Sequence, residues 1–327
     1  MFKFEIIRVV VNSKCNLQCL YCHKEGANIK SEYKLPNIMR GLKFLQQFGL
    51  KSVGLTGGEI FLDKNIKQLI SSLATEFEIF ISTNGTTLRE KDILFLKSVG
   101  VMRINLSLDS VNPEKYSYLT GAKSYVQKVL SVANFAKNNG LFVNLNLVVV
   151  PNMNDTTEDI LEYCETVKYV CDRVSVIRAY SSPDNKFSGN FINFNFQNFI
   201  NVLVKLSTQC EILSYENRSR SIKLLINGCY VYIKDYLPNL LHEPCLNCIY
   251  KSQCMEWIIS PRLLSDTGEI RMCLYRDDIT VNLFDISNDP TSENIFELTS
   301  FIEKLGESPV YPEFNFDVFG GGGKSNV

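Results

Sequence analysis

The sequence has little net charge, few histidines and no long hydrophobic run. Its 327 residues carry a formal net charge of −1 and include one tryptophan and two histidines. A nearly neutral chain is not attracted to polyanions by its bulk charge, so we expect no nucleic-acid partner. No apolar stretch approaches the roughly 20 residues that a membrane-spanning helix needs, so we expect no membrane partner either.

A secretory signal is also missing from the start of the sequence. Residues 1–11 alternate between apolar and polar side chains and lack the cleavage pattern of a signal peptide. We therefore interpret the protein as cytoplasmic. Hydrophobic residues make up 45% of the chain, which is enough for a sizeable core.

Cysteine, in contrast, is abundant, with 11 in the chain. In a reducing compartment, clustered cysteines are more often metal ligands or catalytic thiols than disulfides. Two clusters stand out, one at residues 15–22 and one at residues 245–273. The scattered cysteines are interpreted as core residues: Cys164, Cys171, Cys210 and Cys229.

Strand and helix patterns alternate along the first half of the chain. Strands are expected at residues 4–11, 52–55, 78–82, 103–108, 142–150 and 173–178. Helices are expected between them at residues 36–48, 65–73, 90–99 and 157–170, and a longer helical stretch after the fourth strand ends at residue 139. Six alternations predict right-handed βαβ units around a parallel sheet. They suit a partial (β/α)6 TIM barrel better than a full eight-stranded one, with the working residues at the carboxyl ends of the strands.

The second half of the chain is expected to add a smaller domain to this α/β barrel. The predicted division is a barrel at 1–180, a linker and helical segment at 181–219, and a C-terminal domain at 220–327. A helix is predicted at 194–213 and extended segments at 221–233 and 269–273. The glycine-rich end, 320–327, is flexible by composition.

The first cysteine cluster has the spacing CX3CX2C, formed by Cys15, Cys19 and Cys22. Three thiolates on a short loop can hold three irons of a [4Fe–4S] cube and leave the fourth iron open for a small molecule. A zinc site completed by His23 is the alternative. Three motifs follow predicted strands: Gly57-Gly58-Glu59, Thr83-Asn84-Gly85 and Ser107-Leu108-Asp109.

The cysteine spacing, with Tyr21 before the third cysteine and Gly57-Gly58-Glu59 after a strand, resembles the radical S-adenosylmethionine (SAM) superfamily. The resemblance implies that SAM binds the open iron and is cleaved by one electron to methionine and a 5′-deoxyadenosyl radical. That radical abstracts hydrogen from a substrate, while the protein positions the cofactors. An electron donor such as flavodoxin or ferredoxin is then an expected partner.

Residues 105–110, 118–121 and 148–154 further resemble the MoaA family, the GTP 3′,8-cyclases of molybdenum cofactor biosynthesis. This resemblance implies two sets of site residues. The expected SAM contacts are Tyr21, Gly57, Gly58, Glu59, Asn84, Ser107, Asp109 and Arg178. The expected substrate contacts are Arg8, Thr83, Asn144 and Arg173.

Two positions depart from this family. An arginine and a lysine that contact the nucleotide in the family fall on Gly54 and Asn144 here. The loss of two cations weakens the binding of a triphosphate, because a hydrogen bond to a charged group contributes about 1.5–3 kcal/mol.

The second cysteine cluster consists of Cys245, Cys248, Cys254 and Cys273. The spacing from Cys254 through Gly268 to Cys273 resembles the auxiliary-cluster pattern of twitch and SPASM enzymes. Four ligands would hold a complete [4Fe–4S] cluster, whereas three would leave an iron open to substrate. A structural zinc with four thiolates is the alternative.

Three functions follow from these patterns. The first is a MoaA-like radical SAM enzyme that acts on a GTP-like nucleotide or another small molecule. The second is a radical SAM maturase of a ribosomal peptide, of the twitch or SPASM type. The third is a non-catalytic zinc or iron–sulfur protein.

Overall fold

The structure of the protein, a computed structural model, describes residues 4–179, 194–213, 220–235, 261–271, 273 and 280–306. The predicted ligands Cys245, Cys248 and Cys254 lie outside these ranges, as does the glycine-rich end of the chain. In the part of the chain that is described, no helix is long and apolar enough to cross a membrane.

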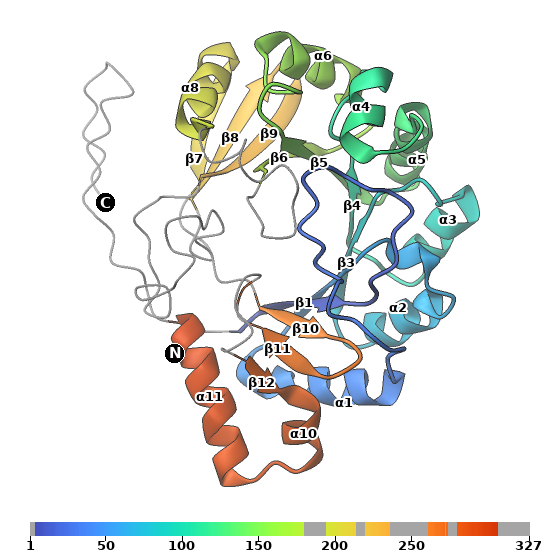
Figure 1. Cartoon of the computed structure of the whole chain (residues 1–327), viewed down its shortest axis with the longest axis vertical. Coiled ribbons are helices and arrows are strands. Elements are labelled where there is room, and N and C mark those ends of the chain that lie inside the picture. Colours follow the sequence, from blue (N-terminus) through green and yellow to red (C-terminus); the bar gives the residue numbers. More distant parts are fainter. Residues whose placement is uncertain are drawn as a thin grey trace, which may run out of the picture.

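Six parallel strands form the barrel that the sequence predicted. They pair in chain order as β1 (Ile6–Val10), β2 (Ser52–Thr56), β3 (Glu78–Thr83), β4 (Arg103–Ser107), β5 (Phe142–Val149) and β6 (Arg173–Arg178). The helices that follow them are α1 (Leu35–Leu45), α2 (Ile66–Ala74), α3 (Glu90–Ser98), α4 (Pro113–Thr120), α5 (Val126–Asn138) and α6 (Thr157–Val167). Figure 1 shows the strands as an arc with these helices on its outer side. The predicted α/β partial barrel of six strands is therefore confirmed.

Alternate residues of each barrel strand face the helices and form the core. In β4, for example, Ile104 and Leu106 are fully buried in the main hydrophobic cluster. The intervening residues, Arg103, Asn105 and Ser107, lie on the other side of the sheet because side chains alternate along a strand. This second side, called the inner face below, is the concave side of the arc.

The helical stretch predicted up to residue 139 is wrong in one respect, because it is two helices. Helix α4 ends at Thr120, and Gly121 adopts a left-handed φ of 63°. Glycine takes this conformation without a steric penalty and is the usual residue just past a helix end. Helix α5 then begins at Val126.

The helix predicted at residues 194–213 is also only partly correct. Helix α8 (Phe196–Leu206) ends before a strand, β7 (Gln209–Leu213). The apolar residues of α8 recur at helical spacing, whereas the segment after Ser207 alternates with period two and pairs with β8. Cys210 lies in this strand and is exposed, so its interpretation as a core residue is wrong.

Strands from the second half of the chain extend the sheet at both edges. On one side β9 (Cys229–Asp235) pairs parallel with β6, followed by β8 (Arg220–Ile226) and β7. On the other side β10 (Arg262–Leu264) pairs parallel with β1, followed by β11 (Glu269–Arg271) and β12 (Thr280–Asn282). Helices α10 (Leu283–Asn288) and α11 (Ser292–Gly306) come last. The division into domains at residues 180 and 220 stays a prediction.

Candidate active site

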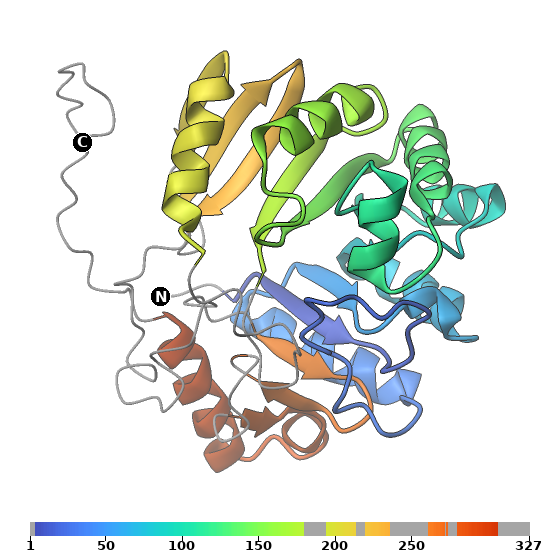
Figure 2. The ribbon, with the colours of Figure 1, turned by 45° about the horizontal axis from the view of Figure 1, so that its top comes forward.

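The cysteine loop, residues 11–34, joins β1 to α1 and passes over the inner side of the arc (Figures 1 and 2). The Gly57-Gly58-Glu59 segment holds its beginning through two backbone hydrogen bonds. Gly58 N donates to Asn12 O at 3.0 Å, and Glu59 N donates to Lys14 O at 2.7 Å. A Cβ atom at Gly58 would lie 2.2 Å from Lys14 O, so only glycine allows this approach.

Glu59 is turned away from solvent and organises the strand ends. Its carboxylate is fully buried and accepts hydrogen bonds from Thr83 Oγ1 at 2.7 Å, Asn84 N at 2.7 Å and Phe61 N at 3.1 Å. Burial raises the pKa of Glu59, and these hydrogen bonds oppose the rise. The side chain therefore fixes the turn after β3, and its direct contact with SAM stays a prediction.

Asn84 connects that turn to the first cysteine. Its Nδ2 donates to Asn16 Oδ1 at 2.9 Å and lies 4.0 Å from Cys15 Sγ. Asn16 Nδ2 in turn donates to Thr86 Oγ1 at 2.8 Å. The predicted SAM contact at Asn84 is thus placed beside a predicted cluster ligand.

The end of α4 holds the middle of the cysteine loop. Gln18 N donates to Thr120 O and Leu20 N donates to Leu119 O, both at 2.9 Å. A Cβ atom at Gly121 would lie 2.9 Å from Gln18 O. The sequence did not predict that residues 118–121 anchor the loop, although Gly121 was a signal for a close approach at this point.

Tyr21 and Asp109 hold the loop next to Cys22. The Tyr21 hydroxyl donates to Asp109 Oδ2, and Val148 N donates to Asp109 Oδ1 at 2.8 Å. Asn154 Nδ2 donates to the Asp109 carbonyl at 2.6 Å. Burial raises the pKa of Asp109 to about 6. These two predicted SAM contacts therefore touch each other, and Tyr21 stands two positions after Cys19 in the sequence.

The three cysteines have the donor chemistry of an iron–sulfur site. Cys15 and Cys22 are exposed and Cys19 is partly buried, and Lys24 N donates to Cys22 Sγ at 3.3 Å. Burial raises the pKa of the Cys15 and Cys19 thiols, and the negative charges of Glu59, Asp109 and the neighbouring thiolates add to this rise. Such mutual repulsion would be relieved by bound iron, so the residues present fit a [4Fe–4S] cluster with three protein ligands.

Among the residues with described positions, no group of three or more His, Cys, Asp and Glu side chains converges on a point that could hold a single metal ion. A cube does not need such convergence because each cysteine binds a different iron. His23, the alternative zinc ligand, has its Nε2 atom 3.9 Å from Glu25 Oε2.

Glu25 is a buried acid that the sequence did not single out. Its carboxylate lies 2.6 Å from Arg262 Nε and 3.6 Å from Arg8 Nη1, and it accepts a 2.8 Å hydrogen bond from Thr56 Oγ1. The two arginines hold the pKa of Glu25 well below its usual range, against the opposing effect of burial. The predicted substrate contact Arg8 is therefore part of an ion cluster that ties the loop to β1, β2 and β10.

Asn144 and Arg173, two other predicted substrate contacts, meet on the inner face. Arg173 Nε and Ser175 Oγ both donate to Asn144 Oδ1 at 2.7 Å, and Asn144 Nδ2 donates to Asn146 Oδ1 at 2.7 Å. The Arg173 guanidinium carbon also lies 5.1 Å from the centre of the Tyr232 ring. The fourth predicted contact, Thr83, is already used by Glu59.

Ser107 and Arg178, expected to contact SAM, lie at the carboxyl ends of β4 and β6. Ser107 is half-buried. Arg178 Nη2 donates to Phe194 O at 3.1 Å, and the guanidinium carbon lies 5.8 Å from the centre of the Phe196 ring. Their contacts with SAM stay predictions.

The remaining cysteines fall into two groups. Cys164, Cys171 and Cys229 are buried as predicted, and hydrogen bonds from the first two lower the pKa of the Cys229 thiol. Cys273 is half-buried, and its three predicted partner ligands lie outside the described residues.

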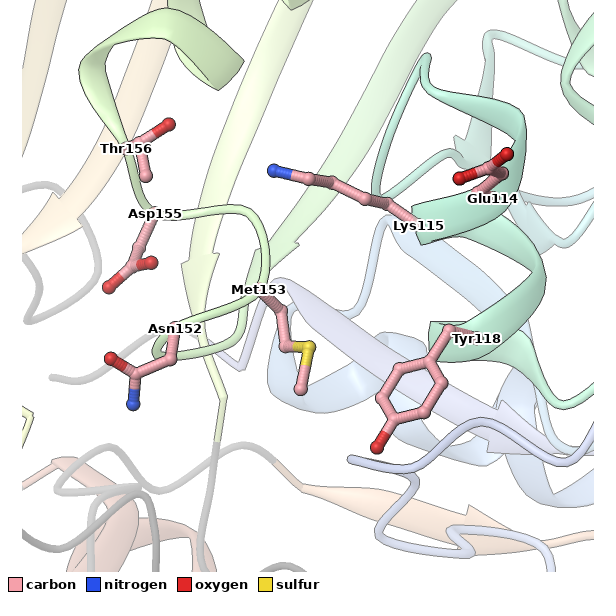
Figure 3. Close-up of a pocket in the computed structure, with 7 residues that line it drawn as sticks. All are labelled: Glu114, Lys115, Tyr118, Asn152, Met153, Asp155 and Thr156. Atoms are coloured by element: carbon pink, nitrogen blue, oxygen red, sulfur yellow. The ribbon is translucent and has the colours of Figure 1, made fainter.

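A pocket of about 740 Å³ lies beside α4. Figure 3 shows its lining residues, which come from α4 and from the segment between β5 and α6: Glu114, Lys115, Tyr118, Asn152, Met153, Asp155 and Thr156. Met153 packs in a small apolar cluster that includes Tyr21. None of the site residues predicted from the sequence lines this pocket.

Comparison with known proteins supports the assignment of the first half. The family model described as the radical SAM superfamily matches residues 9–164. A protein of Archaeoglobus fulgidus named "Probable GTP 3′,8-cyclase" is 37% identical over 48% of this chain and 53% of its own length. The chain thus matches about half of that relative. A protein of Methanothermobacter marburgensis with the same name is 25% identical over 93% of this chain and 95% of its own.

Solved structures support the fold. Streptococcus suis SuiB is similar with a TM-score of 0.63 at 16% identity, over 88% of this chain and 66% of that one. The structure of anSMEcpe with bound AdoMet has a TM-score of 0.64 at 18% identity, over 93% of this chain and 84% of that one. The family model thus identifies residues 9–164, which contain the cysteine loop and most of the barrel, as a match to the radical SAM superfamily, and the solved structures agree with this fold.

Proposed function

We propose that this radical SAM enzyme acts on a nucleoside triphosphate in a reaction like that of the GTP 3′,8-cyclases. The observation that carries the proposal is similarity along nearly the whole chain to proteins named "Probable GTP 3′,8-cyclase". The closer similarity, at 37% identity, covers the half that contains the cysteine loop.

Cys15, Cys19 and Cys22 would hold a [4Fe–4S] cluster with an open iron for SAM. When bound, this pair supplies the electron transfer that cleaves SAM to methionine and a 5′-deoxyadenosyl radical. The chain's own residues shape the loop around it. Glu59 fixes the turn that carries Asn84, while Tyr21 and Asp109 hold the loop next to Cys22.

The inner face supports an anionic substrate. Arg173 lies there with only neutral partners among the described residues, namely the Asn144 amide oxygen and the rings of Phe142 and Tyr232. Burial lowers the pKa of Arg173, and the neighbouring Tyr232 opposes this effect. A positive charge held in this way is stabilised by a negatively charged ligand such as a phosphate group.

The proposal is tested by anaerobic incubation of the reconstituted enzyme with SAM, dithionite and GTP. We expect 5′-deoxyadenosine well above the substrate-free background, together with consumption of GTP. ATP serves as the matched control for nucleotide identity. If GTP leaves 5′-deoxyadenosine at background, GTP is not the substrate.

A second candidate is a maturase of a ribosomal peptide. It is favoured by Gly54 and Asn144, which are neutral where the GTP 3′,8-cyclase family has cations. A precursor peptide encoded beside this gene is the substrate to test, by mass spectrometry after incubation with SAM and dithionite. A change in peptide mass that depends on SAM would favour this function over nucleotide cyclisation, and an unchanged peptide would count against it.

We also propose a second [4Fe–4S] cluster with Cys245, Cys248, Cys254 and Cys273 as ligands. The support is the spacing of these residues in the sequence. Anaerobically purified protein should contain about eight irons per chain. About four irons and one zinc would instead indicate a structural zinc site. Flavodoxin or ferredoxin is the proposed electron donor.

A further inference from the structure

A phenylalanine occupies the space over Gly54 on the inner face. Gly54 and Phe80 are register partners on β2 and β3. A Cβ atom at Gly54 would lie 2.2 Å from Phe80 Cε2, so no larger side chain fits at this position while the ring stays there. The ring of Phe80 thus occupies the space that a side chain at residue 54 would need, at the position where the GTP 3′,8-cyclase family has an arginine.

The same ring also contacts the guanidinium of an arginine from the next strand. Arg103 of β4 is the register partner of Phe80, and its guanidinium carbon lies 4.9 Å from the ring centre. A guanidinium over an aromatic face is attracted by the negative charge of the ring face. A row of register partners thus crosses β2, β3 and β4 at Gly54, Phe80 and Arg103. Its last member, Arg103, places a positive charge on the inner face.

Arg103 has no acidic partner within the described ranges. Its Nε atom is buried and makes no hydrogen bond, and the side chain takes part in no ion pair there. Burial and the nearby charge of Arg173 lower the pKa of Arg103 to about 10. A guanidinium offers five N–H donors, and leaving them unsatisfied inside a protein is costly.

Arg173 is the second positive charge of this region. It stands on β6 on the same inner face, and its Nε donates to Asn144. Two guanidinium groups near each other repel unless an anion lies between them, and phosphate oxygens match the fork of N–H donors.

We propose that Arg103, held by Phe80, forms with Arg173 an anion-binding subsite for the phosphate chain of the substrate. Arg103 supplies from β4 the charge that Gly54 does not provide from β2. The identity of the substrate rests on the proposed function, whereas polyphosphate binding follows from the two arginines themselves.

Isothermal titration calorimetry with inorganic tripolyphosphate, on the full-length reconstituted protein under anaerobic conditions, tests this subsite. We expect the unaltered protein to bind and Arg103→Gln to bind at least about tenfold more weakly. Arg103→Lys, which keeps the charge, should recover part of the affinity. Lys91→Gln is the matched control, because Lys91 is exposed on α3 and its loss removes one positive charge away from the inner face.

A second variant guards against a folding failure of Arg103→Gln. Phe80→Leu keeps the charge and an apolar side chain but removes the ring under the guanidinium, so we expect affinity to fall by about threefold. Iron content and thermal unfolding show that each variant is folded. No binding of tripolyphosphate to the unaltered protein, or equal affinity in the unaltered protein and in a folded Arg103→Gln or Phe80→Leu, would overturn the proposal.

The subsite and the proposed function fail in different ways. If GTP gives no 5′-deoxyadenosine but tripolyphosphate still binds through Arg103, the subsite stands and the substrate is another polyanion. If GTP is converted and Arg103→Gln leaves the KM for GTP unchanged, the function stands and the subsite is wrong.

Discussion

Single side chains connect the cysteine loop to the barrel. Gly58 allows residues 57–59 to approach Lys14, and Glu25 joins the loop to Arg8 and Arg262. Both contacts lie a few residues from the predicted cluster ligands, so they set the path of the loop.

Gly58→Ala should reduce the iron content of the protein. The new Cβ atom would lie 2.2 Å from Lys14 O, which forces the backbone next to Cys15 to move. Gly100→Ala is the control, because a Cβ there meets no atom within 4 Å, and its cost is backbone strain of about 1–2 kcal/mol away from the loop. Iron analysis after reconstitution should give a lower value for Gly58→Ala alone, and equal values would show that the close approach is not needed.

Glu25→Gln should destabilise the protein by about 3 kcal/mol at neutral pH, because two arginines, of which Arg262 is 4% exposed, lose their buried counter-charge. The measurement is urea unfolding under anaerobic conditions. Since the folded pKa of Glu25 is depressed, its stabilising effect is present above the pKa of the unfolded chain and is lost as pH falls through the folded value. Lys51→Gln, which removes an exposed ion-pair partner of Glu5, should change stability by less than about 1 kcal/mol. A Glu25→Gln effect as small as that of the control would contradict this account.

The cysteine ligands could be predicted from the sequence because all three lie within eight residues. Their supports could not. Glu59 bonds to Thr83 and Asn84, and Glu25 bonds to Arg262, across 24 to 237 positions of sequence. Such contacts depend on the register of the strands, which no local pattern encodes.

Among the elements, helix α3 shows how a single charge supports a helix start. Asp92 is nearly buried in its first turn, accepts from Arg89 N at 3.0 Å and lies 2.6 Å from Lys67 Nζ of α2. An acid near a helix N-terminus is favoured by the helix dipole, and this one also joins two helices.

Asp92→Asn should lower the free energy of unfolding by about 1–2 kcal/mol at pH 7. Hydrogen bonds and the Lys67 charge hold the folded pKa of Asp92 below its usual value, against the effect of burial. The stabilisation is therefore present above the unfolded pKa near 4 and disappears as pH falls through the folded pKa. Thermal unfolding at several pH values should show the two proteins converging in acid, and a constant difference down to the lowest pH would contradict this.

The parallel strands and most helices could be predicted because hydrophobic periodicity and glycine ends mark them locally. The break at Gly121 was missed because helical patterns on both sides of it looked continuous. Strand β7 was missed because it directly follows a helix and its pattern covers only five residues. Strand β10 is short and forms by pairing with β1, which is distant in sequence, so no local pattern predicts it.

At the scale of the whole molecule, the sheet of the described residues has twelve strands, with the six-stranded barrel at its centre. Three strand-end motifs and the end of α4 all hold one loop, residues 11–34. At the amino-terminal ends of β4 and β6, the inner face carries two arginines without acidic partners in the described ranges, Arg103 and Arg173. Under the proposed function, the radical would form at the carboxyl ends of the strands, and the arginines would bind an anionic part of the substrate.

The central claim is that Cys15, Cys19 and Cys22 hold the cluster that cleaves SAM. The most direct test is the amount of 5′-deoxyadenosine formed by the reconstituted enzyme with SAM and dithionite, compared with a Cys19→Ala variant. We expect product from the unaltered protein and none above the enzyme-free background from Cys19→Ala, with circular dichroism showing that the variant is folded. Equal product from both proteins, or none from the unaltered one, would contradict the account.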